Sequence, residues 1–140
     1  MRILLVEDSK AIRRANESAL LKAGYEVTCA EDGESALQLA EEQKPDLILL
    51  DMILPKLSGP EVLQRLKREP QTAAIPVVVL SSLTEKNRQK LMEEGAEEYI
   101  EKNTLMPLPG MNLLPKMLEN ITCRINRKRG RAFSDVPIPK

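Results

Sequence analysis

The stretch Leu47-Ile48-Leu49-Leu50-Asp51-Met52-Ile53-Leu54-Pro55 decides the fold. Its first four residues form an unbroken apolar run, as a strand buried on both faces of a sheet requires. Asp51 ends this run, and Pro55, Gly59 and Pro60 then indicate a loop. The stretch therefore predicts a central parallel strand with a carboxylate at its carboxyl end.

Similar apolar runs alternate with longer segments of helical periodicity along the whole chain. Strands joined by helices of this length run parallel, with right-handed crossovers. We therefore predict an α/β fold, a doubly wound five-stranded parallel sheet with the flavodoxin-like strand order 2-1-3-4-5. The predicted strands cover residues 3–6, 25–30, 47–50, 75–80 and 97–101, and the predicted helices begin at Ser9, Asp32, about Pro60, Thr84 and about Asn112.

Composition excludes several classes of function. The chain has no histidine, which rules out serine triads, imidazole metal sites and a role as phosphohistidine donor. Its three aromatic residues are too few for a base-stacking nucleic-acid binder or an aromatic-lined carbohydrate site. Charges interrupt every apolar run and appear too early for a signal peptide, so we expect a cytoplasmic protein that does not enter a membrane.

Charge is unevenly distributed although the net charge is zero. Residues 123–140 carry a balance of +5, and the remainder carries −5. We expect a domain at residues 1–122 and a basic helix end and tail at residues 123–140. Cations are favourable at a helix C-terminus, so the basic segment does not by itself indicate nucleic-acid binding. Direct DNA binding is not expected without an effector domain.

Three carboxylates are predicted to converge at one edge of the sheet. In the 2-1-3-4-5 order the winding reverses between strands 1 and 3, and ligands bind there, outside the carboxyl ends of the strands. Glu7 and Asp8 end the first strand, and Asp51 ends the third. Either aspartate alone is compatible with a turn or helix cap, but three acids together repel one another unless a cation is present.

Oxygen ligands of this kind suit Mg²⁺, which keeps several waters and needs only one or two direct carboxylates. We expect Asp8 and Asp51 to be direct ligands and the backbone carbonyl of Ile53 to be a third candidate. Glu7 is expected to act through a bound water. The predicted cofactor is therefore a magnesium ion.

Ser81 follows the fourth predicted strand and Lys102 follows the fifth, so both lie on the same edge as the acids. Taken singly, each is an ordinary loop or surface residue. Together with a metal-bound carboxylate they predict a phosphoryl site, with Asp51 as the nucleophile that forms an acyl phosphate. Magnesium and Lys102 would stabilise the phosphoryl oxygens, and Ser81 would donate a hydrogen bond to one of them.

The sequence resembles the receiver domain of bacterial two-component response regulators over roughly residues 2–121. The resemblance rests on five stretches, namely Leu5-Val6-Glu7-Asp8, Leu49-Leu50-Asp51-Met52-Ile53-Leu54-Pro55 with Gly59, Val78-Val79-Leu80-Ser81, Gly95-Ala96-Glu97-Glu98-Tyr99, and Lys102. Their combined spacing is highly specific, whereas no single stretch is.

The resemblance implies a phosphorelay function. A sensor histidine kinase or a histidine phosphotransfer protein would donate the phosphoryl group to Asp51. Tyr99 would turn inward as Ser81 moves, and the face formed by helix 4, strand 5 and helix 5 would contact a downstream protein or a second copy of the chain. Receivers usually have proline after the conserved lysine, but Asn103 follows Lys102 here, and we expect a trans peptide bond between them.

Three other functions are alternatives to this one. An aspartyl-phosphate phosphatase would need a second aspartate two residues after the nucleophile, where this chain has Ile53. A flavin or nucleotide carrier would need a phosphate-binding loop after the first strand, where Glu7 and Asp8 stand instead. A receiver-like module that only binds partners would have lost an acid, Ser81 or Lys102, and the sequence keeps them all. The sequence therefore favours a phosphoacceptor that performs its own phosphoryl transfer and slow autodephosphorylation and is otherwise not an enzyme.

Overall fold

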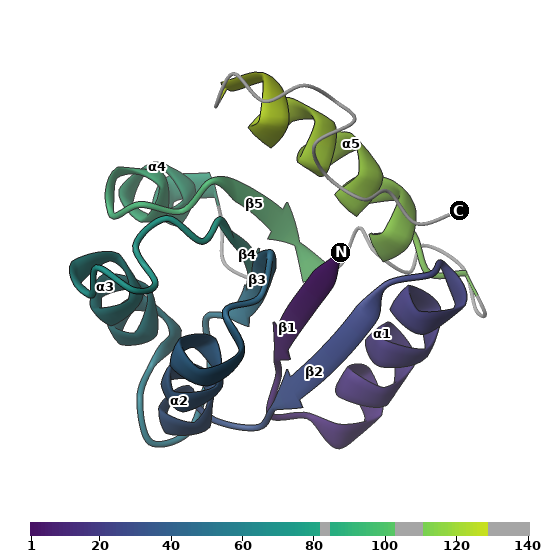
Figure 1. The fold of residues 1–140 in the computed structure, drawn as a ribbon, viewed down its shortest axis with the longest axis horizontal. Coiled ribbons are helices and arrows are strands. Elements are labelled where there is room, and N and C mark those ends of the chain that lie inside the picture. The colour runs from purple at the N-terminus through teal and green to yellow at the C-terminus, as the bar shows by residue number, and fades with distance from the viewer. Residues whose placement is uncertain (82–84, 103–110, 129–140) are drawn as a thin grey trace.

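Five parallel strands form one sheet in the order β2-β1-β3-β4-β5, with helices on both faces (Figure 1). The computed structural model describes residues 1–81, 85–102 and 111–128, without the side chains of 85–87 and 128. The elements in chain order are β1 (Arg2–Val6), α1 (Lys10–Lys22), β2 (Glu26–Ala30), α2 (Gly33–Gln43), β3 (Leu47–Asp51), α3 (Gly59–Arg68), β4 (Val77–Ser81), α4 (Glu85–Glu93), β5 (Glu98–Glu101) and α5 (Leu114–Lys128). The predicted fold class and strand order are confirmed.

Alternate residues of the central strands enter two separate apolar clusters. Leu4 and Ile48 face the layer of α2, α3 and α4, whereas Leu5 and Leu49 face the layer of α1 and α5. Figure 1 shows these two helix layers on opposite sides of the sheet. Because both faces are covered, the only polar positions that central strands can offer to a ligand are at their ends.

Polar side chains begin three of the helices. The side chains of Ser9, Asp32 and Ser58 accept hydrogen bonds from the third backbone N–H beyond them, which satisfies a donor that the helix leaves free. The caps at Ser9 and Asp32 were predicted. The third predicted helix begins slightly earlier than expected because Ser58, and not the loop at Pro60, supplies its cap.

Two strand boundaries differ from the predictions. The fourth strand begins at Val77 and not at residue 75. Ile75 donates its N–H to Thr72 in a turn, and Pro76 has no N–H to donate to a neighbouring strand. The second strand begins at Glu26, since the Tyr25 N–H still donates to Leu20 at the end of α1.

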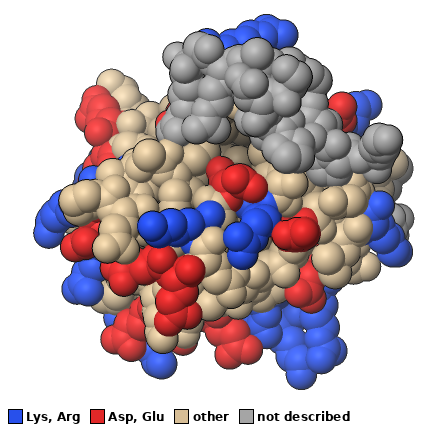
Figure 2. Space-filling model, viewed as in Figure 1, with Lys and Arg blue, Asp and Glu red and all other residues tan. Residues whose placement is uncertain are grey.

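The last helix begins at Leu114, after the Asn112 side chain accepts from its N–H. The predicted cap at Thr84 and the proline-rich stretch at residues 103–110 lie outside the described residues. None of the described helices is both long enough and apolar enough to cross a lipid bilayer. Figure 2 shows acidic and basic side chains interspersed on the visible face.

Candidate functional site

Three carboxylates meet where β1 and β3 end. Glu7 and Asp8 follow β1, and Asp51 is the last residue of β3. One carboxylate oxygen from each of the three lies within 4.8 Å of the others. Glu7 is fully buried and Asp51 is 3% exposed, whereas Asp8 lies at the surface. The convergence that the topology predicted is therefore present, with one acid accessible and two enclosed.

Lys102 joins the two buried acids. Its Nζ donates to Asp51 Oδ2 at 2.8 Å and to Glu7 Oε1 at 2.9 Å. The lysine side chain is 24% exposed, so it is partly shielded from water. Its position depends on β5, which ends at Glu101 next to β4 at the edge of the sheet. The peptide bond from Lys102 to Asn103 lies outside the described residues.

The charges of this cluster perturb one another. Burial, together with the neighbouring Asp51, raises the pKa of Glu7 to about 7, and the ammonium of Lys102 opposes this rise. Burial alone would lower the pKa of Lys102, but its hydrogen bonds to Asp51 and Glu7 outweigh that effect and raise it. Lys102 is therefore held as a cation between the two buried carboxyl groups.

Ser81 and Ile53 lie beside Asp51. Ser81 ends β4 and is 1% exposed, and its neighbour Leu80 pairs with Asp51 across the sheet. The Ile53 N–H donates to Asp51 Oδ1 at 3.2 Å, and the Ile53 side chain is exposed. This bond fixes the loop after β3 against the carboxylate, so the backbone of Ile53 borders the acid cluster.

Tyr99 lies on β5 opposite Val79 and is half-buried. It packs against the apolar cluster that α2, α3 and α4 share with the sheet. The predicted switch residue is thus on the side of the sheet that α4 covers, three residues before Lys102.

Arg13 was missed by the sequence analysis. Its Nη1 donates to the backbone carbonyls of Glu7, at 3.0 Å, and Asp8, at 3.4 Å. Its position near the start of a helix hinted at a specific contact, because the helix dipole makes a cation unfavourable there unless a nearby acceptor compensates. Its acceptors, however, are backbone atoms that a residue pattern does not reveal.

The donor set fits a magnesium ion. Three carboxylates supply hard oxygen ligands, and the exposed Asp8 leaves a side open to water, as Mg²⁺ binding requires. Three carboxyl groups lie together here and Lys102 pairs with only two of them, so a divalent cation would balance the charge of the ionised cluster. The residues at this edge therefore suit the predicted cofactor.

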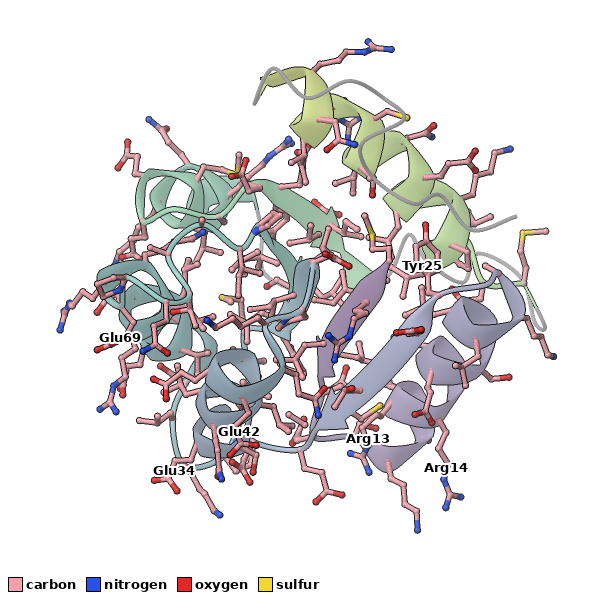
Figure 3. All side chains as sticks on the ribbon, in the orientation of Figure 1. Arg13, Arg14, Tyr25, Glu34, Glu42 and Glu69 are labelled. Atoms are coloured by element: carbon pink, nitrogen blue, oxygen red, sulfur yellow. The ribbon has the colours of Figure 1, made fainter. Side chains whose placement is uncertain are left out.

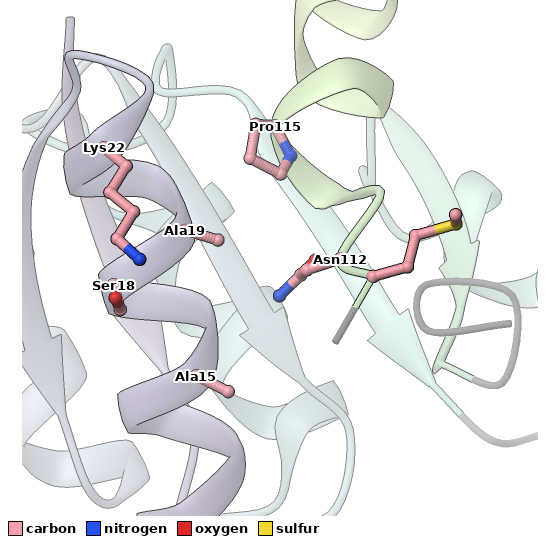
Figure 4. Close-up of a pocket in the computed structure, with 7 residues that line it drawn as sticks. Ala15, Ser18, Ala19, Lys22, Asn112 and Pro115 are labelled. Atoms are coloured by element: carbon pink, nitrogen blue, oxygen red, sulfur yellow. The ribbon is translucent and has the colours of Figure 1, made fainter. Parts of the chain in front are cut away.

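A separate hollow lies away from the acids, between α1 and the start of α5 (Figure 4). Its volume is about 490 Å³, and Ala15, Ala19 and Pro115 are among the residues that line it. Asn112, at its edge, donates to the buried Asn16 of α1 at 3.0 Å and so fixes the start of α5. This hollow contains none of the predicted site residues.

Comparison with known proteins supports one family. The family model of the response regulator receiver domain matches residues 3–107. The phosphate regulon transcriptional regulatory protein PhoB of Pseudomonas aeruginosa is 37% identical over 97% of this chain and 56% of its own length. The gliding motility regulatory protein of Myxococcus xanthus is 40% identical over 87% of this chain and 15% of its own length. The chain thus spans about half or less of these two relatives.

Solved receiver structures have the same fold. The chemotaxis response regulator CheY4 of Vibrio cholerae superposes with a TM-score of 0.74 at 28% identity, over 86% of this chain and 97% of that one. The receiver domain of the sensor histidine kinase PA1611 from Pseudomonas aeruginosa has a TM-score of 0.66 at 32% identity, over 72% of this chain and 84% of that one, and holds a magnesium ion in its active-site cleft. This chain belongs to the response regulator receiver domain family of two-component systems.

Proposed function

We propose that this protein is a phosphoacceptor of a two-component phosphorelay and that Asp51 receives the phosphoryl group with the help of Mg²⁺. The observation that carries the proposal is the position of Lys102, whose Nζ bridges Asp51 and the buried Glu7 beside the exposed Asp8. A cation, a nucleophilic carboxylate and an accessible acid thus occupy one edge of the sheet.

The reaction follows from these groups. An oxygen of the Asp51 carboxylate attacks phosphorus, forming an acyl phosphate P–O bond while the P–N bond of a phosphohistidine breaks. The bonding electrons stay on the departing imidazole nitrogen, and the ring leaves as neutral imidazole because its other nitrogen carries a proton. The Lys102 ammonium neutralises charge on the transferred oxygens. A magnesium ion bound by Asp8 and Asp51, with the Ile53 carbonyl and a water held by Glu7, would neutralise the remainder.

Ser81 and Tyr99 are proposed to transmit the event. A phosphoryl group on Asp51 offers new acceptor oxygens, and the hydroxyl of the buried Ser81 is one strand away. A shift of Ser81 and Lys102 toward those oxygens would change the packing around Tyr99 on β5. We propose that α4, β5 and α5 then present the altered face to a downstream protein or a second copy of the chain.

The phosphoryl donor is proposed to be a sensor histidine kinase or a histidine phosphotransfer protein, acting in the cytoplasm. Receiver domains are phosphoryl acceptors and not classical enzymes, so turnover of an external substrate is not part of the proposal. The boundary after residue 122 stays a prediction. α5 continues to Lys128 and its Ile125 packs in the core, so the proposed basic segment begins within a helix.

Phosphoryl uptake tests the proposal directly. The protein is incubated with acetyl phosphate, with or without Mg²⁺, and weighed by intact mass spectrometry. We expect one added phosphoryl group with Mg²⁺ and none with a chelator. Asp51→Asn should abolish the adduct. Asp46→Asn makes the same chemical change just before the opposite end of β3, where Asp46 accepts from the Arg2 N–H, and should leave the adduct intact.

A histidine phosphotransfer protein carrying a phosphoryl group serves as a second donor in the same experiment. If neither donor yields an adduct, the phosphoacceptor proposal is wrong and a module that only binds partners takes its place. An adduct that persists in Asp51→Asn would move the acceptor to another residue and would equally reject the proposal.

A further inference from the structure

Arg13 reaches from α1 beneath the acid pair that follows β1. Its Nη1 donates to Glu7 O at 3.0 Å and to Asp8 O at 3.4 Å, and its Nη2 pairs with Glu31 Oε1 at 3.2 Å. The Arg13 side chain is only 12% exposed, although it lies near the start of α1, where its neighbour Arg14 is exposed. Its planar guanidinium can serve three acceptors at once, which a lysine ammonium cannot do with the same geometry.

The ion pair with Glu31 does not explain this position. The Glu31 side chain is 74% exposed, and exposed pairs contribute little because water and salt screen them. The neighbouring Arg14 makes the contrast clear, since it is exposed and Figure 3 shows its side chain directed away from the sheet. The buried end of Arg13 is instead occupied with backbone carbonyls.

The two carbonyls belong to the peptide groups on either side of Asp8. Because a peptide group is planar, holding both carbonyls limits the backbone dihedrals of Asp8 and hence the direction in which its side chain leaves the chain. Other bonds hold the ends of the same segment. Glu7 N–H donates to Ala30 O at 3.0 Å, and the Arg13 N–H donates to Ser9 O at 2.8 Å.

Asp8 depends on this support more than the other acids do. Glu7 and Asp51 are enclosed and share the Lys102 ammonium, whereas Asp8 is exposed and takes its direction from the backbone. We propose that Arg13 is a positioning residue for the divalent cation site, holding the backbone so that the Asp8 carboxylate faces Glu7 and Asp51. The inference rests on the proposed function, because that function assigns Asp8 to a metal ion.

Charge alone would act in the opposite direction. Removing a cation from the neighbourhood of three carboxylates should strengthen the binding of a divalent ion, whereas releasing the backbone should weaken it. The sign of the change in affinity therefore separates the two roles. A merely structural role would lower the unfolding temperature without changing the affinity of the folded protein.

The experiment titrates the full chain with Mn²⁺ and follows the EPR signal of the free ion, with Mg²⁺ as competitor. The variants are Arg13→Ala, Arg13→Lys and the matched control Arg14→Ala. We expect Arg13→Ala to weaken binding on the order of ten-fold, as is common when a group that orients a ligand is lost. Arg13→Lys keeps the charge but not the planar fork of donors, so its loss of affinity should be smaller, and Arg14→Ala should bind as the wild type does.

Each outcome has a distinct meaning. Unchanged or tighter Mn²⁺ binding by both folded Arg13 variants, beside normal binding by the wild type, overturns the positioning role and leaves the proposed function standing. Absence of Mn²⁺ binding by the wild type overturns both. If Arg13→Ala does not fold, Arg13→Lys decides alone, because weakened binding in that charge-preserving variant supports the role and wild-type affinity rejects it.

Discussion

Lys102 donates from Nζ to Asp51 Oδ2 over 2.8 Å, although β4 lies between β3, which Asp51 ends, and β5, which Lys102 follows. The same nitrogen also donates to Glu7, the residue that follows β1. A single ammonium thus connects the ends of β1, β3 and β5. Its loss would leave two enclosed carboxylates without their shared counter-ion, which makes Lys102 the most informative position to change.

Lys102→Met removes the charge while keeping an unbranched side chain of similar bulk. Phosphoryl transfer from acetyl phosphate at saturating Mg²⁺ should slow by about 10² or more, because a cation that stabilises the transferred oxygens is gone. The rate is measured from the growth of the phosphorylated mass. Lys116→Met, on the exposed side of α5, makes the same change and should leave the rate unaltered. Equal rates in both variants would show that Lys102 does not contribute to phosphoryl transfer.

Glu7 makes stability depend on pH when divalent ions are absent. Its pKa is about 7 in the folded protein against an ordinary 4.5, so the folded state holds a proton that the unfolded state releases between these values. The free energy of unfolding should therefore fall as pH rises from about 4.5 to 7, by at most about 1.4 kcal/mol per pH unit.

Urea unfolding in a chelator at several pH values measures this slope. Glu7→Gln should flatten it, whereas Glu42→Gln, an exposed change on α2, should not. A wild-type stability that rises over the same range would contradict the raised pKa.

Position 59 requires glycine because the backbone of Asp51 and Met52 leaves no room for a Cβ there, and not because of an unusual backbone angle. A Cβ there would overlap Met52 Cα and lie 2.6 Å from Asp51 O. Gly59→Ala should therefore destabilise the protein by about 1–3 kcal/mol and displace the loop after Asp51, weakening Mn²⁺ binding. Ser58→Ala removes the neighbouring helix cap and should cost about 1 kcal/mol without altering ion affinity. Identical ion affinity in the two variants would show that the close approach does not position Asp51.

The sheet and the acid cluster were predictable because both follow from simple patterns. Continuous apolar runs such as residues 47–50 are what a strand covered on both faces requires, and parallel strands bring their carboxyl ends to one edge. Glu7, Asp8 and Asp51 could therefore be placed together without knowledge of any side-chain geometry. The start of β4 could not be placed, because Ile75 fits a strand by composition but its N–H is used in a turn.

The hydrogen bonds of the long side chains could not be predicted from the sequence. Lys102 was expected at the same edge of the sheet as the acids. Its hydrogen bonds to Glu7 and Asp51, however, depend on the direction that its side chain takes after β5. Arg13 was missed because it contacts carbonyl oxygens, which every residue has. A sequence pattern can reveal contacts between particular side chains, but it cannot reveal a contact with backbone atoms that all residues share.

The pair Arg124–Glu98 ties α5 to β5 next to Tyr99. Arg124 Nε lies 2.7 Å from Glu98 Oε1, and the side chains are 53% and 10% exposed. A double-mutant cycle with Glu98→Gln and Arg124→Gln should give a coupling energy of about 0.5–1 kcal/mol in urea unfolding, because the glutamate is largely removed from water. The pair Arg2–Glu26, at 3.7 Å and with both side chains more than half exposed, is the matched control and should give a smaller value. A coupling at Arg124–Glu98 no larger than at Arg2–Glu26 would mean that this ion pair does not hold α5 against β5, and any readout through α5 would then depend on the apolar contacts of Leu118 and Ile121.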